Sequence, residues 1–108
     1  QVAGVTFAPR CLTDVPAKDL KPMADEMKAR MGSGVVALVA VNEGKASLVV
    51  SVSDDLTEKF DAVSLVRIGA KTLGGKGGGG RPDMAQAGGP DGAKAAQALE
   101  AIEKALAG

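Results

Sequence analysis

The segment 73–89, which reads LGGKGGGGRPDMAQAGG, holds the residue types of this chain that are best suited to binding a ligand. Eight of its seventeen residues are glycine, which loses more conformational freedom on folding than any other residue. The backbone N–H groups of a glycine-rich segment can bind an anion, and Lys76 and Arg81 add positive charge. We therefore predict an irregular loop between two helices, outside the core, that a ligand approaches closely.

Positive charge gathers around this segment, although the chain as a whole is neutral, which by itself argues mildly against a nucleic-acid partner. The range 67–81 contains four basic residues and no acidic one, whereas the other 93 residues hold nine basic and thirteen acidic groups. The chain has no Tyr or Trp on which unpaired bases could stack. Recognition of folded RNA by its shape and phosphates fits these features best, so we predict an RNA ligand.

Other kinds of site fit the sequence less well. Residues 75–80 match G-x-G-x-x-G, but the dinucleotide fingerprint requires a preceding strand and a helix that opens at the motif. A P-loop requires Ser or Thr after its Gly-Lys pair, and here Gly77 follows. We expect neither catalysis nor a metal or cofactor in this chain, because it has no histidine and Cys11 has no partner for a nucleophilic dyad.

We predict that nucleic-acid contacts come from the glycines, the basic side chains and two further polar residues of this region. These residues are Lys71, Gly75, Lys76, Gly77, Gly78, Gly79, Gly80, Arg81, Asp83, Gln86, Gly88 and Gly89. Asp83 and Gln86 could hydrogen-bond base edges or tie the segment to itself, and for Asp83 we favour the second role. A flexible linker is a further alternative, but RPDMAQA is too varied for a Gly/Ser spacer.

Length and composition fit a single domain spanning residues 1–108. An apolar content of 45% with two aromatic residues predicts a core of aliphatic side chains. One cysteine excludes an internal disulfide and favours a reducing, cytoplasmic setting. No apolar run approaches the ~20 residues that span a bilayer, so no membrane partner is expected. A start at Gln1 is typical of a module taken from a longer protein.

Hydrophobic periodicity predicts strands and helices in the order β-α-β-β-α-loop-α. The predicted strands are 5–12, 34–41 and 46–53, and the predicted helices are 19–31, 61–73 and 90–107. The second and third strands form a hairpin around the turn residues 42–44. We predict an α/β (α+β) sandwich, in which helices cover a small sheet of about three or more strands with this hairpin at its centre.

Single positions refine this arrangement. Pro9 cannot donate a ladder hydrogen bond, so its strand should lie at a sheet edge. The apolar run 34–41 is typical of a strand covered on both faces, whereas alternation over 46–53 predicts a half-exposed strand. Gly69 lies on the buried face of its helix, which predicts a close neighbour there. Pro90 suits the first position of the last helix.

The segment 77–89 resembles the signature of a known family. GGGGRPDMAQAGG, the strand GSGVVALVAV that begins at Gly32, and the helix ending in LGGKGGGG are similar to the C-terminal (C-Ala) domain of alanyl-tRNA synthetases, which belongs to the DHHA1 superfamily. The resemblance covers essentially the whole chain. It implies a non-catalytic module of a multidomain ligase, which binds the outer corner of the L-shaped tRNA and supports aminoacylation and editing of tRNA(Ala).

The same resemblance implies partners and cofactors. The partners would be tRNA(Ala), the other domains of the parent synthetase and, in a homodimer, a second copy of the chain, all in the cytoplasm. ATP, Mg²⁺ and Zn²⁺ would serve parts of the parent enzyme outside this chain. The family resemblance assigns tRNA contacts to residues 74–89 as a region and not to single side chains.

Two alternatives from other functional classes stay open. DHH-type phosphoesterases that degrade short oligonucleotides carry a related domain with a motif resembling GGGH-x-x-AAG. This sequence has Arg81 where that pattern has His, and PDMAQ follows, which favours the synthetase family. The neutral net charge prompts the other alternative, a protein-binding or oligomerisation module.

Overall fold

The computed structural model describes residues 6–13, 15–75 and 78–107. Its strands are β1 (Phe7–Thr13), β2 (Val35–Asn42), β3 (Lys45–Val52), β4 (Gly79–Arg81) and β5 (Met84–Gly89). Its helices are α1 (Leu20–Met31), α2 (Ala62–Thr72) and α3 (Ala95–Ala107), with short 3₁₀ turns at Ala17–Asp19, Asp54–Leu56 and Gly92–Lys94. Within these ranges, every helix falls short of the length and apolarity that crossing a bilayer requires.

The five strands form one mixed sheet in the order β1-β2-β3-β5-β4. The helix α1 connects β1 to its parallel neighbour β2, and all other neighbouring strands are antiparallel. The β2–β3 hairpin pairs Val35 with Val52 and Val41 with Ala46, and it lies inside the sheet as the sequence predicts. The predicted fold class, a small sheet with a central hairpin covered by helices, is confirmed.

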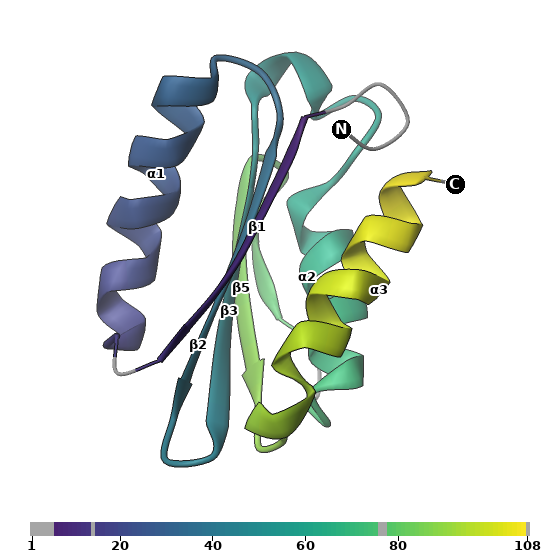
Figure 1. Ribbon diagram of the computed structural model, residues 1–108. Helices are drawn as coiled ribbons and strands as arrows, with labels where there is room; N and C mark the ends of the chain where they lie inside the picture. The colour runs from purple at the N-terminus through teal and green to yellow at the C-terminus, as the bar shows by residue number, and fades with distance from the viewer. Residues whose placement is uncertain (1–5, 14, 76–77, 108) are drawn as a thin grey trace.

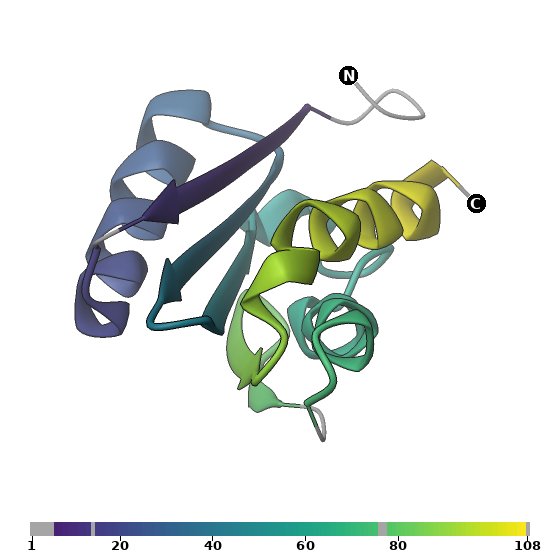
Figure 2. The ribbon, with the colours of Figure 1, turned by 60° about the horizontal axis from the view of Figure 1, so that its bottom comes forward.

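Helices cover both faces of this sheet (Figure 1; Figure 2). The helix α1 lies on one face, and α2 and α3 lie together on the other. Each face therefore has its own apolar cluster, and β3 contributes to both. The cluster beneath α2 and α3 includes Ala46, Leu48, Val50 and Val52 of β3. The cluster beneath α1 consists of Leu20, Ala24, Val36, Leu38, Ala40, Val49 and Met84.

The strand β1 lies at the sheet edge, as Pro9 predicts. The Thr6 carbonyl accepts a hydrogen bond from Val35 N at 2.8 Å, so the backbone groups of every second residue from Thr6 face β2. The nitrogen of Pro9 consequently faces the free edge, where the missing N–H costs no ladder hydrogen bond. Arg10 Nη1 donates to the Pro9 carbonyl at 2.8 Å, so this backbone acceptor on the free edge also has a hydrogen-bond partner.

The segment 73–89 is not the irregular loop that we predicted. After α2 the chain forms the β4–β5 hairpin, which adds two strands to the sheet beside β3. Met84 and Ala85 are 5% and 1% exposed, so the segment also contributes to the core, contrary to the prediction. Alanine and glycine have little preference for strands, and the pairing of β5 with β3 imposes the strand conformation.

The prediction of a half-exposed β3 was also wrong. Val49 is 2% exposed and Ser51 is fully buried, because α1 covers the face on which both lie. Ser51 Oγ donates to the Asp83 carbonyl oxygen at 3.4 Å. A small hydroxyl with a partner can be buried at little cost, so the polar alternation did not signal exposure.

Two of the three helices begin and end close to the predicted residues. The Asp61 carboxylate caps α2 by accepting a hydrogen bond from Val63 N at 2.9 Å. The last helix begins at Ala95 instead of Pro90, because the 3₁₀ turn Gly92–Lys94 precedes it. Gly92 N donates to Gly44 O at 2.8 Å, so a contact with the β2–β3 turn fixes this entry into α3.

Gly69 brings α2 close to its neighbours, as predicted. A Cβ at this position would lie 2.5 Å from Leu48 Cδ2 and 3.0 Å from Ile102 Cδ1. Both of those side chains are fully buried. Glycine therefore allows α2 to pack tightly against β3 and α3. This packing fixes the position of α2, from which the chain enters the β4–β5 hairpin.

Acidification is expected to weaken the contact between the turn after β3 and the α1–β2 connection. Ser33 Oγ donates to Asp55 Oδ2 at 2.6 Å, and hydrogen bonds from Ser33 and Ser53 lower the pKa of the Asp55 carboxyl. A carboxyl whose pKa is lower in the folded state stabilises the fold above its unfolded-state pKa of about 3.9. This contribution is lost as the pH falls through the folded-state pKa.

Asp55→Asn should therefore destabilise the domain at about pH 7 and lose its effect at about pH 2, as measured by urea unfolding at both pH values. Asp54→Asn, at the exposed neighbouring position, is the matched control. If both variants show the same dependence of stability on pH, the Ser33–Asp55 contact is not the cause.

Candidate nucleic-acid interface

The turn of the β4–β5 hairpin is fixed to the rest of the domain. Ala62 N, at the start of α2, donates to Pro82 O at 2.9 Å, and Val52 N donates to Asp83 O at the same distance. These bonds hold the hairpin against both α2 and the end of β3. The strand β4 is the edge strand of the sheet on the side opposite β1. The β4–β5 hairpin thus presents a fixed surface.

Most glycines of this segment are required by the packing of the protein itself. A Cβ at Gly75 would overlap the Gly88 carbonyl oxygen, and a Cβ at Gly88 would lie 2.7 Å from the Ala46 carbonyl oxygen. Gly74 has a φ of +77°, which other residues rarely adopt. Similar overlaps with backbone atoms occur at Gly78, Gly80 and Gly89. These glycines are explained without a ligand.

Gly79 differs from the other described glycines of the segment. In the described part of the chain, no heavy atom outside its immediate neighbours lies within 4 Å of the position that its Cβ would take. Its φ lies outside the range that favours glycine. Gly79 pairs with Gln86 across the hairpin, and both residues are exposed. Internal packing does not require glycine here, so the predicted close approach of a ligand still applies to this position.

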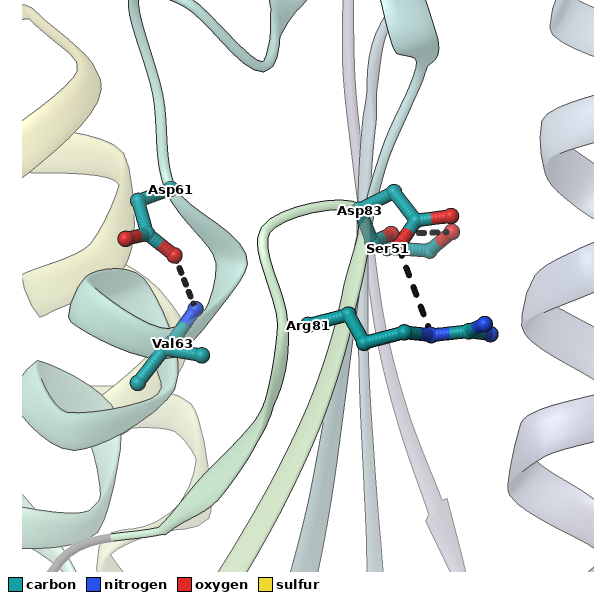
Figure 3. A network of polar contacts seen from close by, with 5 residues as sticks. All are labelled: Ser51, Asp61, Val63, Arg81 and Asp83. Atoms are coloured by element: carbon teal, nitrogen blue, oxygen red, sulfur yellow. Dashed lines mark hydrogen bonds and ion pairs between the residues drawn. The ribbon is translucent and has the colours of Figure 1, made fainter.

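Arg81 and Asp83 form an ion pair at the hairpin turn (Figure 3). Arg81 Nε lies 3.7 Å from Asp83 Oδ1, and the Arg81 side chain is 78% exposed. Val52 N and Ser51 Oγ both donate to the Asp83 carbonyl oxygen, so the residue that carries this carboxylate is fixed. The terminal nitrogens of Arg81 point away from Asp83 (Figure 3). The Arg81 side chain thus extends from the turn into solvent.

The sheet separates the predicted basic residues into two groups. Arg81 lies opposite Met84, which packs beneath α1, so the Arg81 side chain extends on the α1 side of the sheet (Figure 3). Lys71 is exposed in the last turn of α2, on the other side of the sheet. The predicted contacts at Lys76 and Gly77 lie outside the described residues. The structure therefore does not gather Lys71 and Arg81 on one surface.

Two residues that the prediction left out of the contact set support this region. Arg67 Nε donates to the Gly78 carbonyl at 3.4 Å and so connects α2 to the start of the hairpin. The sequence signals for Arg67 were its place in the basic range 67–81 and its spacing of four residues from Lys71, which puts both on one helix face directed toward the glycine-rich segment. Ser51 Oγ donates to the Asp83 carbonyl, and one serine in the polar alternation of β3 gives little indication of such a role.

The chemistry available at the hairpin is charge, hydrogen bonding and close contact with the backbone. Gln86 offers both a donor and an acceptor on the exposed side of β5. Over residues 6–13, 15–75 and 78–107, no three His, Cys, Asp or Glu side chains gather closely enough to hold a metal ion. The groups present suit recognition of a ligand that carries anionic and hydrogen-bonding groups.

The sequence profile of the DHHA1 domain matches residues 4–108, which include the entire hairpin. The chain belongs to the DHHA1 domain family. This DHHA1 domain is 63% identical over 107 residues to an alanine–tRNA ligase of Paramagnetospirillum magneticum and 61% identical over 109 residues to that of Sinorhizobium medicae. The alignments cover 99% and 100% of the domain but only 12% of each ligase. The domain thus spans a small part of the length of these relatives.

Solved structures give the same assignment. The C-Ala domain of Aquifex aeolicus alanyl-tRNA synthetase matches with a TM-score of 0.93 and 30% identity, over all of this DHHA1 domain and 96% of that chain. A DHH-domain protein described as a member of a family of ribosomal proteins matches with a TM-score of 0.55 and 26% identity, over 87% of this domain and 22% of that chain. The resemblance to the C-terminal domain of alanyl-tRNA synthetases is confirmed.

Proposed function

We propose that this DHHA1 domain is a non-catalytic tRNA-binding module of an alanyl-tRNA synthetase. It binds the outer corner of tRNA(Ala) and so supports aminoacylation and editing by the parent enzyme in the cytoplasm. The observation that carries the proposal is the whole-chain agreement with a C-Ala domain at a TM-score of 0.93. In this proposal ATP, Mg²⁺ and Zn²⁺ serve other domains of the synthetase. Self-association of the domain stays a prediction.

The hairpin supports RNA as the ligand. Arg81 carries its charge at an exposed turn, and its ion pair with Asp83 leaves the terminal guanidinium nitrogens directed outward. An arginine in this position can donate paired hydrogen bonds to a phosphate. Gln86 can hydrogen-bond a base or a ribose, and Gly79 lets the ligand reach the backbone of β4. Together these groups offer phosphate contact and hydrogen bonding without an aromatic platform.

Intact tRNA should bind the domain with a shallow dependence on salt. A neutral domain with few clustered charges releases few counterions, so log K should fall with log[salt] at a slope no steeper than about −3 to −4. Titration of labelled tRNA(Ala) at several KCl concentrations measures both the affinity and the slope. A much steeper slope would mean that basic residues far from the hairpin dominate binding.

Competition with single-stranded oligonucleotides of equal length tests the preference for folded RNA. Intact tRNA should compete better, because the chain has no Tyr or Trp to stack unpaired bases. Stronger competition by the single strands would favour a role like that of the phosphoesterase domains. If neither RNA binds and the mass in sedimentation rises with protein concentration, the domain is instead an oligomerisation module.

A further inference from the structure

The two faces of the β4–β5 hairpin differ in what covers them. The helix α2 packs on β3, β4 and β5 from one side, whereas α1 packs on β2 and β3 from the other (Figure 2). The hairpin thus extends past α1 toward the sheet edge. On its α1 side the Arg81 and Gln86 side chains are exposed. A large ligand can reach the hairpin from this side without displacing a helix.

Strand register identifies which residues form this surface. Residues opposite each other in antiparallel strands point to the same side. Gln86 lies opposite Val49, which packs beneath α1, and Gly79 lies opposite Gln86. Arg81 extends on the same side (Figure 3). Gly79, Arg81 and Gln86 therefore share one surface, which we call the open face.

We propose that RNA approaches the hairpin on the open face and not from the side of α2. The inference rests on the proposed function and adds the direction of binding. Gly79 brings the RNA within van der Waals contact of β4, because it has no side chain and, among the described residues beyond its chain neighbours, no heavy atom lies within 4 Å of its Cβ position. Arg81 contacts a phosphate, and Asp83 positions it by engaging Nε. Gln86, which lies opposite Gly79 on β5, hydrogen-bonds the RNA beside that contact.

The groups on the α2 side have other roles. Arg67 Nε is engaged with the Gly78 carbonyl at 3.4 Å, so this guanidinium connects α2 to the hairpin. Lys71 is separated from the open face by the sheet. The basic range 67–81 therefore contributes unequally to binding, and Arg81 contributes more than either residue of α2.

A set of matched variants tests the direction of approach by tRNA titration. Gly79→Val fills the space above β4 and should lower the affinity about tenfold or more, as expected for a contact near the centre of an interface. Arg81→Gln should lower it about 3- to 10-fold and make the salt slope shallower by about one. Arg67→Gln removes the same charge from the α2 side and should cost clearly less affinity than Arg81→Gln. Lys71→Gln should cost less affinity than Arg81→Gln.

Thermal unfolding of each variant shows which substitutions leave the fold intact. If Gly79→Val does not fold, Gly79→Ala and Gln86→Ala on the same face decide the question. Failure of the wild-type domain to bind tRNA would overturn the proposed function. Wild-type binding that survives changes on the open face, or that is most damaged by Arg67→Gln or Lys71→Gln, would overturn the direction of approach alone.

Discussion

Replacing Leu48 by alanine is expected to lower the free energy of unfolding by about 2–5 kcal/mol. Leu48 is fully buried in the middle of β3, where α2 packs on the sheet. The substitution removes apolar contacts and leaves a cavity that the surrounding strands and helices can close only in part. Small domains have about 5–15 kcal/mol of stability, so much of it would be lost. Urea unfolding followed by circular dichroism measures the change.

Lys45→Ala is the matched control for this prediction. Lys45 is exposed on the same strand, so its replacement should change the free energy of unfolding by no more than about 0.5 kcal/mol. If Leu48→Ala is as mild as Lys45→Ala, Leu48 does not occupy a closely packed core. The packing of α2 on β3 at Leu48 would then not be what holds α2 against the sheet.

The elements that could be predicted from sequence are those whose pattern of apolar residues matches the burial of those residues in the fold. The run 34–41 contains no polar residue between Val35 and Val41, and it forms β2, which is buried along most of its length. The periodic apolar positions of 61–73 form α2, and Asp61 caps it as expected. In both cases local preference and tertiary packing favour the same conformation, so local reasoning was sufficient.

The strand β5 could not be predicted in this way. Its sequence, MAQAGG, lacks the β-branched and aromatic residues that favour strands. Its conformation follows from pairing with β3 and from burial of Ala85. The paired residues are far apart in sequence: Met84 of β5 pairs with Ser51 of β3, more than thirty residues earlier. Similarly, the start of α3 depends on the contact between Gly92 and Gly44. Interactions distant in sequence fix these elements, and no local pattern reports them.

The candidate site shows the same limit. A glycine run indicates close approach of some group, but the sequence does not say whether that group belongs to a ligand or to the chain. At Gly75 and Gly88 the approaching group is the backbone of the domain itself. Lys71 and Arg81 were grouped because they are close in sequence, and the sheet places them on opposite sides. Sequence reasoning found the segment, and the structure decides the roles of its residues.

Gly75→Ala is expected to destabilise the domain by about 1–3 kcal/mol. The new Cβ would overlap the Gly88 carbonyl oxygen, and this atom belongs to the backbone of β5 and cannot rotate away like a side chain. Either the end of α2 or the base of the hairpin must move. Thermal and urea unfolding measure the loss of stability.

Gly79→Ala provides the comparison, because it makes the same chemical change in the same segment. Its Cβ enters open space, so stability should change by no more than about 0.5 kcal/mol, while tRNA affinity should fall if RNA lies against β4. Gly75→Ala should show the reverse pattern, with lower stability and unchanged affinity of the folded fraction. If both variants lose stability equally, internal packing requires glycine at position 79 just as it does at position 75. Gly79 would then no longer indicate where the RNA binds.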